Sequence, residues 1–191
     1  MLNITAQSAG LGAMKPLEAF GARLPNAQAN VLNRVLTRTR NVVVPAMVRQ
    51  TGLSKRIIAK AVRTYRASPQ NPSVVLLTRG GEVSFRFFGA HEVAGGVEAT
   101  VKGHKDFVEG GFRRSGPKGG RRMVAKLNRQ VYVNVDGKRW RGQIRKEKTG
   151  VFIPYEFVAG ETAKAFWRIV DSDLPVEVEA ELMKLMGQGG R

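Results

Sequence analysis

The sequence predicts an α+β fold, with helices at both ends of the chain and a mostly antiparallel sheet between them. Apolar residues recur at helical spacing in the first third, alternate with polar residues in the middle, and return to helical spacing near the C-terminus. Helices and strands segregated in this way favour α+β over an alternating parallel-sheet fold. We expect one domain over 15–186, between a flexible lead-in over 1–14 and a tail over 187–191.

The N-terminal part predicts three helical segments. A short helix is expected near Pro16, and a longer one follows Pro25. Pro45 should kink or restart this longer helix, because proline lacks the backbone N–H that the helix needs. A third helix is expected over 55–66. Residues 34–66 contain nine Lys or Arg and no acid, so these helices should carry a strongly basic surface.

The middle of the chain predicts strands and an extended arm. Strands at 74–78 and 82–88 flank Arg79-Gly80-Gly81, which is typical of a β-hairpin. A further strand is expected near 97–101. Residues 103–122 are rich in glycine and in basic side chains and show no helix or strand period, so we expect a long basic loop or arm there.

The last part predicts two more strands and the closing helix. Alternation over 131–135 and 138–144, with Asp136-Gly137 between them, predicts two strands joined by a tight turn. A short apolar segment is expected to end at Pro154. The C-terminal helix should restart at Asp173-Leu174-Pro175, with the aspartate as a candidate cap.

The charge is the most unusual property of the composition. Thirty-two Lys and Arg oppose fifteen Asp and Glu, for a formal net charge of +17. Repulsion of this size disfavours a compact chain unless a polyanion or an acidic surface neutralises it. There is no cysteine, which fits folding in a reducing cytoplasm. No apolar run is long enough for a membrane span, and we expect no signal peptide and no membrane partner.

Catalytic chemistry has little support, so we expect a protein that is not an enzyme and has no catalytic residues. His91 and His104 are the only histidines, and no cysteine accompanies them, so no metal and no cofactor are expected. Gly111 and Gly116 have the outer spacing of a phosphate-binding P-loop. However, Pro117 stands where that motif needs lysine, and no helix pattern follows.

Two segments are candidates for contact with nucleic acid. Residues 48–58 resemble a helix, a glycine turn and a serine-capped basic helix, as in a helix-turn-helix reader, although a plain helix pair has the same pattern. Residues 102–148 hold fifteen Lys or Arg against four acids. Few aromatic residues accompany them, which favours contact with phosphates over base stacking. The expected nucleic-acid-binding residues are Arg113, Arg114, Lys118, Arg121 and Arg122.

The order of short motifs resembles the phage minor tail protein Z family, the tail completion proteins of lambda-like siphophages. The likeness covers about residues 26–186 and depends on the order and spacing of the motifs. The matching motifs are Leu32-Asn33-Arg34-Val35, Thr51-Gly52-Leu53-Ser54-Lys55-Arg56, Ala67, Asn71-Pro72, the glycine-rich basic middle, Phe152-Ile153-Pro154 and Leu174-Pro175-Val176-Glu177.

The resemblance implies a structural virion protein of the tail or neck that is assembled in the host cytoplasm. It would complete the tail and support head–tail joining, as a ring, expected to be hexameric, around the DNA channel. Tail terminator, tail tube or head–tail connector proteins would be its partners, and DNA would be contacted without sequence preference. Glu177, Glu179 and Glu181 would face a neighbouring subunit. The alternative is a cytoplasmic nucleic-acid-binding protein, either a helix-turn-helix regulator or a ribosomal-type RNA binder.

Overall fold

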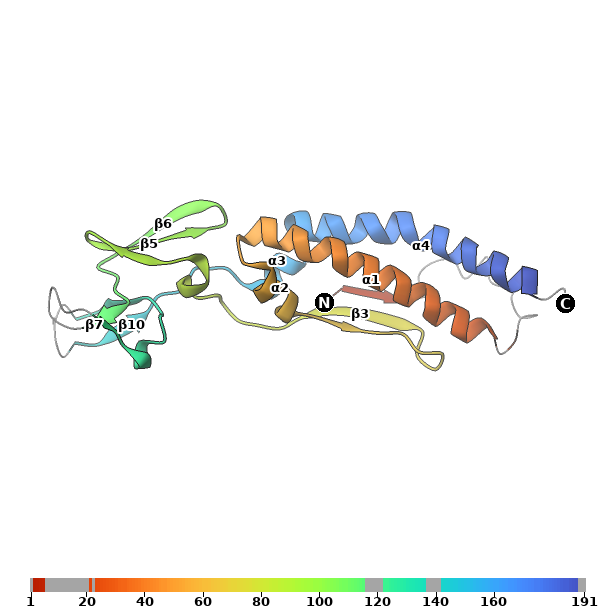
Figure 1. Ribbon diagram of the computed structural model, residues 1–191, viewed down its shortest axis with the longest axis horizontal. Coiled ribbons are helices and arrows are strands. Elements are labelled where there is room, and N and C mark those ends of the chain that lie inside the picture. Colours follow the sequence, from red (N-terminus) through yellow and green to blue (C-terminus); the bar gives the residue numbers. More distant parts are fainter. Residues whose placement is uncertain (1, 6–20, 22, 116–121, 137–141, 189–191) are drawn as a thin grey trace.

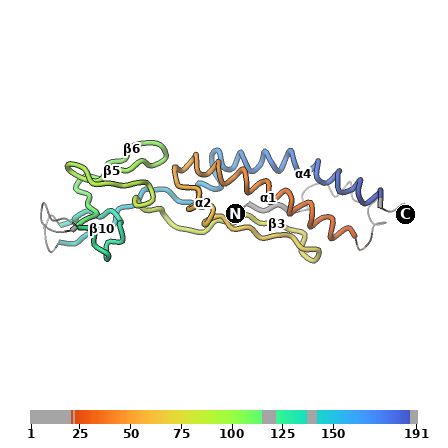
Figure 2. Tube along the Cα trace, viewed as in Figure 1, coloured from red at the N-terminus to blue at the C-terminus, as the bar shows by residue number. Residues whose placement is uncertain are grey.

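The computed structural model describes residues 2–5, 21, 23–115, 122–136 and 142–188, and it has the α+β fold that the sequence predicts. The molecule is elongated (Figures 1 and 2). One part, here called the helical body, comprises residues 2–5, 23–78 and 153–188 and contains the helices and a three-stranded sheet. The other, the β end, spans residues 85–146 and is built from short antiparallel strands.

Two long helices form two of the three layers of the helical body. α1 (Arg23–Thr51) and α4 (Gly160–Gln188) run antiparallel, and α1 lies between α4 and the sheet (Figure 1). The side chain of Gln50 near the end of α1 contacts Thr162 near the start of α4. α1 buries side chains at helical spacing, which is why the periodic pattern of the sequence forms a helix here.

The expected helix breaks at the two prolines are wrong. α1 continues through Pro45 and α4 continues through Pro175, so Asp173 lies within a helix and does not cap one. A proline inside a helix removes one backbone hydrogen bond. Packing outweighs that loss at Pro45, whose neighbours Val44 and Ala46 are both almost fully buried.

A three-stranded antiparallel sheet supports α1. Its order is β1 (Leu2–Thr5), β3 (Ser73–Thr78), β2 (Val62–Tyr65). Two expectations are corrected here, because residues 2–5 form a strand and do not belong to a flexible lead-in, and α2 (Lys55–Ala61) ends before β2 begins. Pairing with β3 stabilises an extended backbone that local pattern alone assigns to a helix.

The expected hairpin between 74–78 and 82–88 is also wrong. Both edges of β3 are already occupied, by β1 and β2, so no edge remains for a hairpin partner. Glu82 instead forms an isolated bridge with Phe152, and Phe85–Phe88 forms a 3-10 helix (η3). The Ser84 side chain accepts a hydrogen bond from the backbone N–H of Arg86 at the start of this turn.

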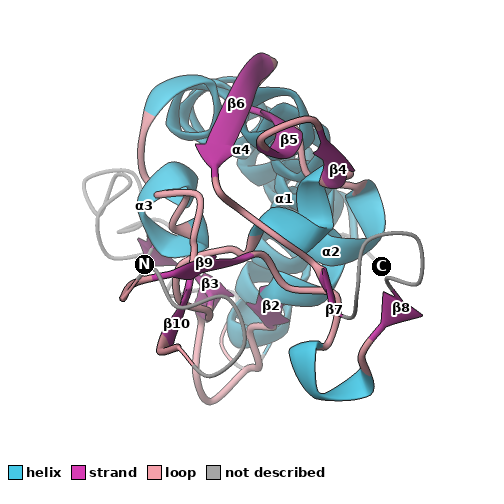
Figure 3. Ribbon diagram, turned by 90° about the vertical axis from the view of Figure 1, so that its left-hand side faces the viewer, coloured by secondary structure: helices cyan, strands magenta, loops and turns pink. Residues whose placement is uncertain are grey.

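The β end begins with a three-stranded meander. β4 (His91–Val93), β5 (Gly96–Val101) and β6 (His104–Glu109) pair antiparallel in sequence order, which confirms the strand expected near 97–101. Residues 104–109 were expected within the arm, and here they are a strand, because β5 offers them an unoccupied edge. Figure 3 looks along the long axis from this end of the molecule.

Smaller pairs complete the β end. β7 (Arg114–Ser115) pairs with β8 (Arg122–Met123), and the tip of the expected arm, residues 116–121, lies outside the described residues. β9 (Tyr132–Asn134) and β10 (Ile144–Lys146) pair antiparallel; β9 lies within the strand predicted over 131–135, whereas β10 begins only at the last residue of the strand predicted over 138–144. A short 3-10 helix, η4 (Ala125–Leu127), precedes β9. Asn134 pairs with Ile144, so the tight two-residue turn expected at Asp136-Gly137 does not join these strands, and residues 137–141 lie outside the description.

Two chain segments connect the β end to the helical body. The backbone N–H of Val83 donates to Val151, and that of Thr149 donates back to Val83, so the outgoing and returning segments are paired. α3 (Ile153–Phe157) follows, and it contains Pro154 in its first turn, where proline is tolerated, so Pro154 does not end the segment as expected. One hydrophobic cluster joins both parts, with Phe88 from the β end and Phe166 from α4 among its members.

We predict that Gly96→Ala destabilises the protein by about 1–2 kcal/mol, as overpacking does. A Cβ atom at Gly96 would lie 2.2 Å from the carbonyl oxygen of Val108 and 2.9 Å from the ring of Phe107. Gly81→Ala is the matched control, because a Cβ atom there meets open space. Urea denaturation measures both variants, and equal stability of the two would contradict the prediction.

Candidate nucleic-acid interface

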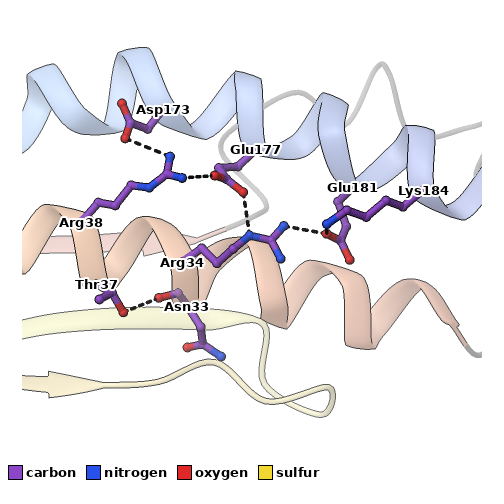
Figure 4. A network of polar contacts seen from close by, with 8 residues as sticks. All are labelled: Asn33, Arg34, Thr37, Arg38, Asp173, Glu177, Glu181 and Lys184. Carbon is purple, nitrogen blue, oxygen red and sulfur yellow. Dashed lines mark hydrogen bonds and ion pairs between the residues drawn. The ribbon is translucent and has the colours of Figure 1, made fainter.

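Three acidic residues of α4, Asp173, Glu177 and Glu181, face α1 and bind its arginines (Figure 4). The Nε of Arg34 lies 2.6 Å from Oε2 of Glu177, and its Nη2 lies 2.6 Å from Oε2 of Glu181. Arg38 contacts Glu177 at 2.6 Å and Asp173 at 3.3 Å. The carboxylates at 173, 177 and 181 are spaced one helical turn apart, so they form a single row along α4.

The ion pairs change the pKa of two members of this contact, Glu181 and Arg34. Partial burial opposes ionisation of Glu181, but hydrogen bonding to Arg34 and the positive charges of Arg34 and Lys184 outweigh it and hold the pKa of Glu181 below its usual range. The same bonds raise the pKa of Arg34, against the opposing effect of its own burial. Both shifts favour the charged forms, so the pair of Arg34 and Glu181 is ionised at neutral pH.

This network gives Glu177 and Glu181 a role other than the expected subunit contact. Both bind arginines of their own chain and hold α4 onto α1, and Glu177 is 8% exposed. Glu179, two residues from both Glu177 and Glu181, is exposed. Three acids close together in sequence indicate a charged surface, but the helical period turns two of them inward.

Most other described carboxylates are also paired within the chain. Glu156 is buried and accepts from the ammonium of Lys102 and from the side chain of Gln50. Four further contacts pair an acid with a basic side chain: Glu82 with Lys148, Glu98 with His91, Glu147 with Arg145, and Glu161 with Lys164. Because most of the described acids are paired in this way, few are left to pair with the remaining Lys and Arg side chains.

The arm residues predicted to bind nucleic acid have different environments. Arg113 is half-buried, and its guanidinium donates to the carbonyl oxygens of Ala90 and Arg129. Burial lowers the pKa of Arg113; Glu92 opposes this shift, and Arg114 and Arg129 add to it. The backbone N–H groups of Arg113 and Arg114 both donate to Glu92, at 2.6 and 2.7 Å. Arg113 thus has a structural role in the β end.

The remaining predicted arm residues are exposed or lie beyond the description. The side chains of Arg114 and Arg122 are exposed on the paired strands β7 and β8. Lys118 and Arg121 fall within residues that the structure does not describe. Of the five predicted residues, two therefore present exposed cations in the described part of the arm.

The helix-turn-helix interpretation does not fit the geometry. α2 is only seven residues long, and the chain continues directly into β2. A recognition helix must reach into the major groove from a compact helical support, whereas α2 is fixed to a sheet through its strand. Three basic side chains of α2 are nevertheless exposed, and they add positive charge to the surface of the helical body: Lys55, Arg56 and Lys60.

A basic groove lies between α1 and β2, and sequence reasoning did not locate it. Its volume is about 670 Å³, and Arg40, Arg63 and Arg66 line it together with Thr37, Asn41 and Tyr65. An adjoining cavity of about 480 Å³ shares Thr37 and Arg66 and continues along α1 past Asn33 and Asn30. The acid-free stretch 34–66 was the sequence signal for this groove. Its last residues were predicted to be helical, however, so the strand that forms one wall of the groove was missed.

Within the described chain, no three His, Asp or Glu side chains gather in a way that could hold a metal ion. None of the described helices combines the length and the apolar character needed to cross a lipid bilayer. No protein-family model, no curated protein and no solved structure matches this chain.

Proposed function

We propose that the protein is a structural component of a phage tail or neck, which completes the tail and supports head–tail joining around the DNA channel. It contacts DNA through charge alone, without sequence preference. One observation carries this proposal: the carboxylates are largely neutralised inside the chain while many cations are not. Exposed Arg49, Lys55, Arg56 and Lys60 have no carboxylate partner among the described residues. A polyanion is the partner that such a surface favours.

The outer face of α4 supports a role in assembly. Val176 is 61% exposed and Met183 is 67% exposed, and their spacing of seven residues places both on one face of the helix. Exposed apolar side chains that share one face of a helix are typical of surfaces that contact other proteins. The motif order shared with the minor tail protein Z family is the reason for placing this assembly at the phage tail.

A DNA-binding measurement tests the electrostatic part of the proposal. Fluorescence anisotropy with two unrelated duplexes and an RNA hairpin should give similar, weak affinities for the two duplexes. The affinity should fall steeply with salt, because phosphate contact releases counterions. Tight binding of one duplex that persists at high salt would indicate a regulator, and a preference for the RNA would indicate a ribosomal-type protein.

Imaging tests the assembly part. Particles made without this protein should show complete heads and tails that are unjoined, or joined and non-infectious. Normal infectious particles in its absence would contradict the proposal. A variant with Val176→Ser and Met183→Ser keeps the charge of the protein unchanged, and it should also reduce joining if the outer face of α4 contacts a neighbour.

A further inference from the structure

We infer that the groove between α1 and β2 is the main DNA-binding site of this protein, and that it holds the phosphate backbone of one strand. This inference rests on the DNA contact proposed above, and it moves that contact from the predicted arm to a different surface. The groove has basic side chains on both walls, Arg40 from α1 and Arg63 and Arg66 from β2 and the residue that follows it.

The groove offers phosphate ligands of the right chemistry. Guanidinium groups bind phosphate oxygens in a fork with two parallel hydrogen bonds. Thr37, Thr64 and Asn41 line the same groove and supply hydroxyl and amide donors, which commonly bind DNA phosphates. Arg63 and Arg66 are exposed and have no carboxylate partner within the described residues, so their charge is available to a ligand.

The length of the groove also suits a nucleic-acid strand. The two adjoining cavities follow α1 from Asn30 to Asn41, which corresponds to about 16 Å along a helix. A DNA strand rises about 3.4 Å per nucleotide, so roughly four or five nucleotides fit along this span. Arg40 and Arg63 line the larger cavity and Arg66 lines both, so the span offers more than one contact to phosphate.

An acidic protein segment is less well suited to this groove. Protein partners bind chiefly through apolar anchors that enter desolvated pockets. The apolar lining residues Leu36 and Val62 are 2% and 3% exposed, so they offer little surface to an anchor. Tyr65 is 47% exposed, and its hydroxyl adds a further donor for a phosphate oxygen.

The test compares three variants of the full-length protein. The groove variant carries Arg40→Gln, Arg63→Gln and Arg66→Gln, and the arm variant carries Arg114→Gln and Arg122→Gln. The control variant removes three exposed cations from other surfaces, by Lys126→Gln, Lys146→Gln and Arg168→Gln. Anisotropy with a random-sequence duplex is measured over a range of NaCl concentrations.

We expect the groove variant to bind DNA roughly 10- to 100-fold more weakly at about 0.1 M salt, and its salt slope to fall by about 2–3. The control variant, with the same loss of charge, should lose much less. Because Arg40 also donates to the carbonyl oxygen of Ala59, a double variant with Arg63→Gln and Arg66→Gln provides a check that does not disturb α1 and α2.

Each outcome has a separate meaning. If the wild type binds DNA and the groove variant equals the control, the groove inference is overturned while the proposed function stands. If the arm variant shows the larger loss, the arm is the site and the groove is not. If the wild type does not bind DNA, the proposed DNA contact itself fails. Competition by poly-glutamate that exceeds competition by DNA would make the groove a protein-binding site and overturn the inference.

Discussion

Phe166→Ala is expected to lower the free energy of unfolding by about 3–5 kcal/mol, the largest effect among the substitutions considered for this protein. Phe166 lies on α4 and is 0% exposed, within the hydrophobic cluster that joins α4, α1 and the β end. Truncation removes the transfer free energy of the ring and leaves a cavity that the surrounding helices cannot fully close.

The neighbouring Trp167 provides a matched control on the same helix. Its ring is 51% exposed and contacts Phe166 edge-on, with ring centroids 5.1 Å apart. Trp167→Ala should cost about 1 kcal/mol, because it loses this aromatic contact and little burial. Denaturant titrations followed by circular dichroism measure both. Comparable losses in the two variants would show that α4 does not pack through Phe166.

Arg34→Gln is expected to destabilise the protein by about 2–3 kcal/mol. The variant loses two charge-assisted hydrogen bonds, to Glu177 and Glu181, each worth about 1.5–3 kcal/mol. The loss is smaller than the sum of the two, because the side chain of Arg34 is partly exposed and the remaining partners Arg38 and Lys184 keep the carboxylates partly paired. Arg49→Gln, which removes an exposed cation from the same helix, should have little effect.

The pH dependence of this difference identifies the ion pair as its cause. The pKa of Glu181 is lower in the folded protein than in the unfolded chain, so its contribution is complete above the unfolded value of about 4.3. It is lost as the pH falls through the lower folded value. The gap between wild type and Arg34→Gln should therefore narrow below about pH 4. A gap that stays constant into acid would indicate lost packing of the arginine stem instead.

The sequence was sufficient to predict a helix or strand wherever the local pattern and the tertiary environment favour the same conformation. Helical spacing of apolar residues predicted both long helices, and alternation predicted β5 and β9. These elements each bury one face, and a buried face leaves a periodic signature in the sequence. The cation surplus was equally evident, since it depends on composition alone.

The sequence failed where long-range contacts decide the local conformation. Residues 62–65 read as the end of a helix, yet pairing with β3 makes them a strand, and this change creates the groove wall that carries Arg63. Pro45 and Pro175 read as breaks, but neither interrupts its helix, and α1 and α4 pack against each other along their lengths.

By itself, the sequence determined the α+β class, the positions of the two long helices and a strong excess of positive charge. Only the tertiary structure decided which charges remain available to a partner. Carboxylates near the C-terminus meet arginines near the N-terminus because α4 folds back along α1, more than 130 residues later in the chain. No local pattern encodes that contact. Charge is a property of composition, whereas its neutralisation depends on which distant side chains the fold brings within a few ångströms.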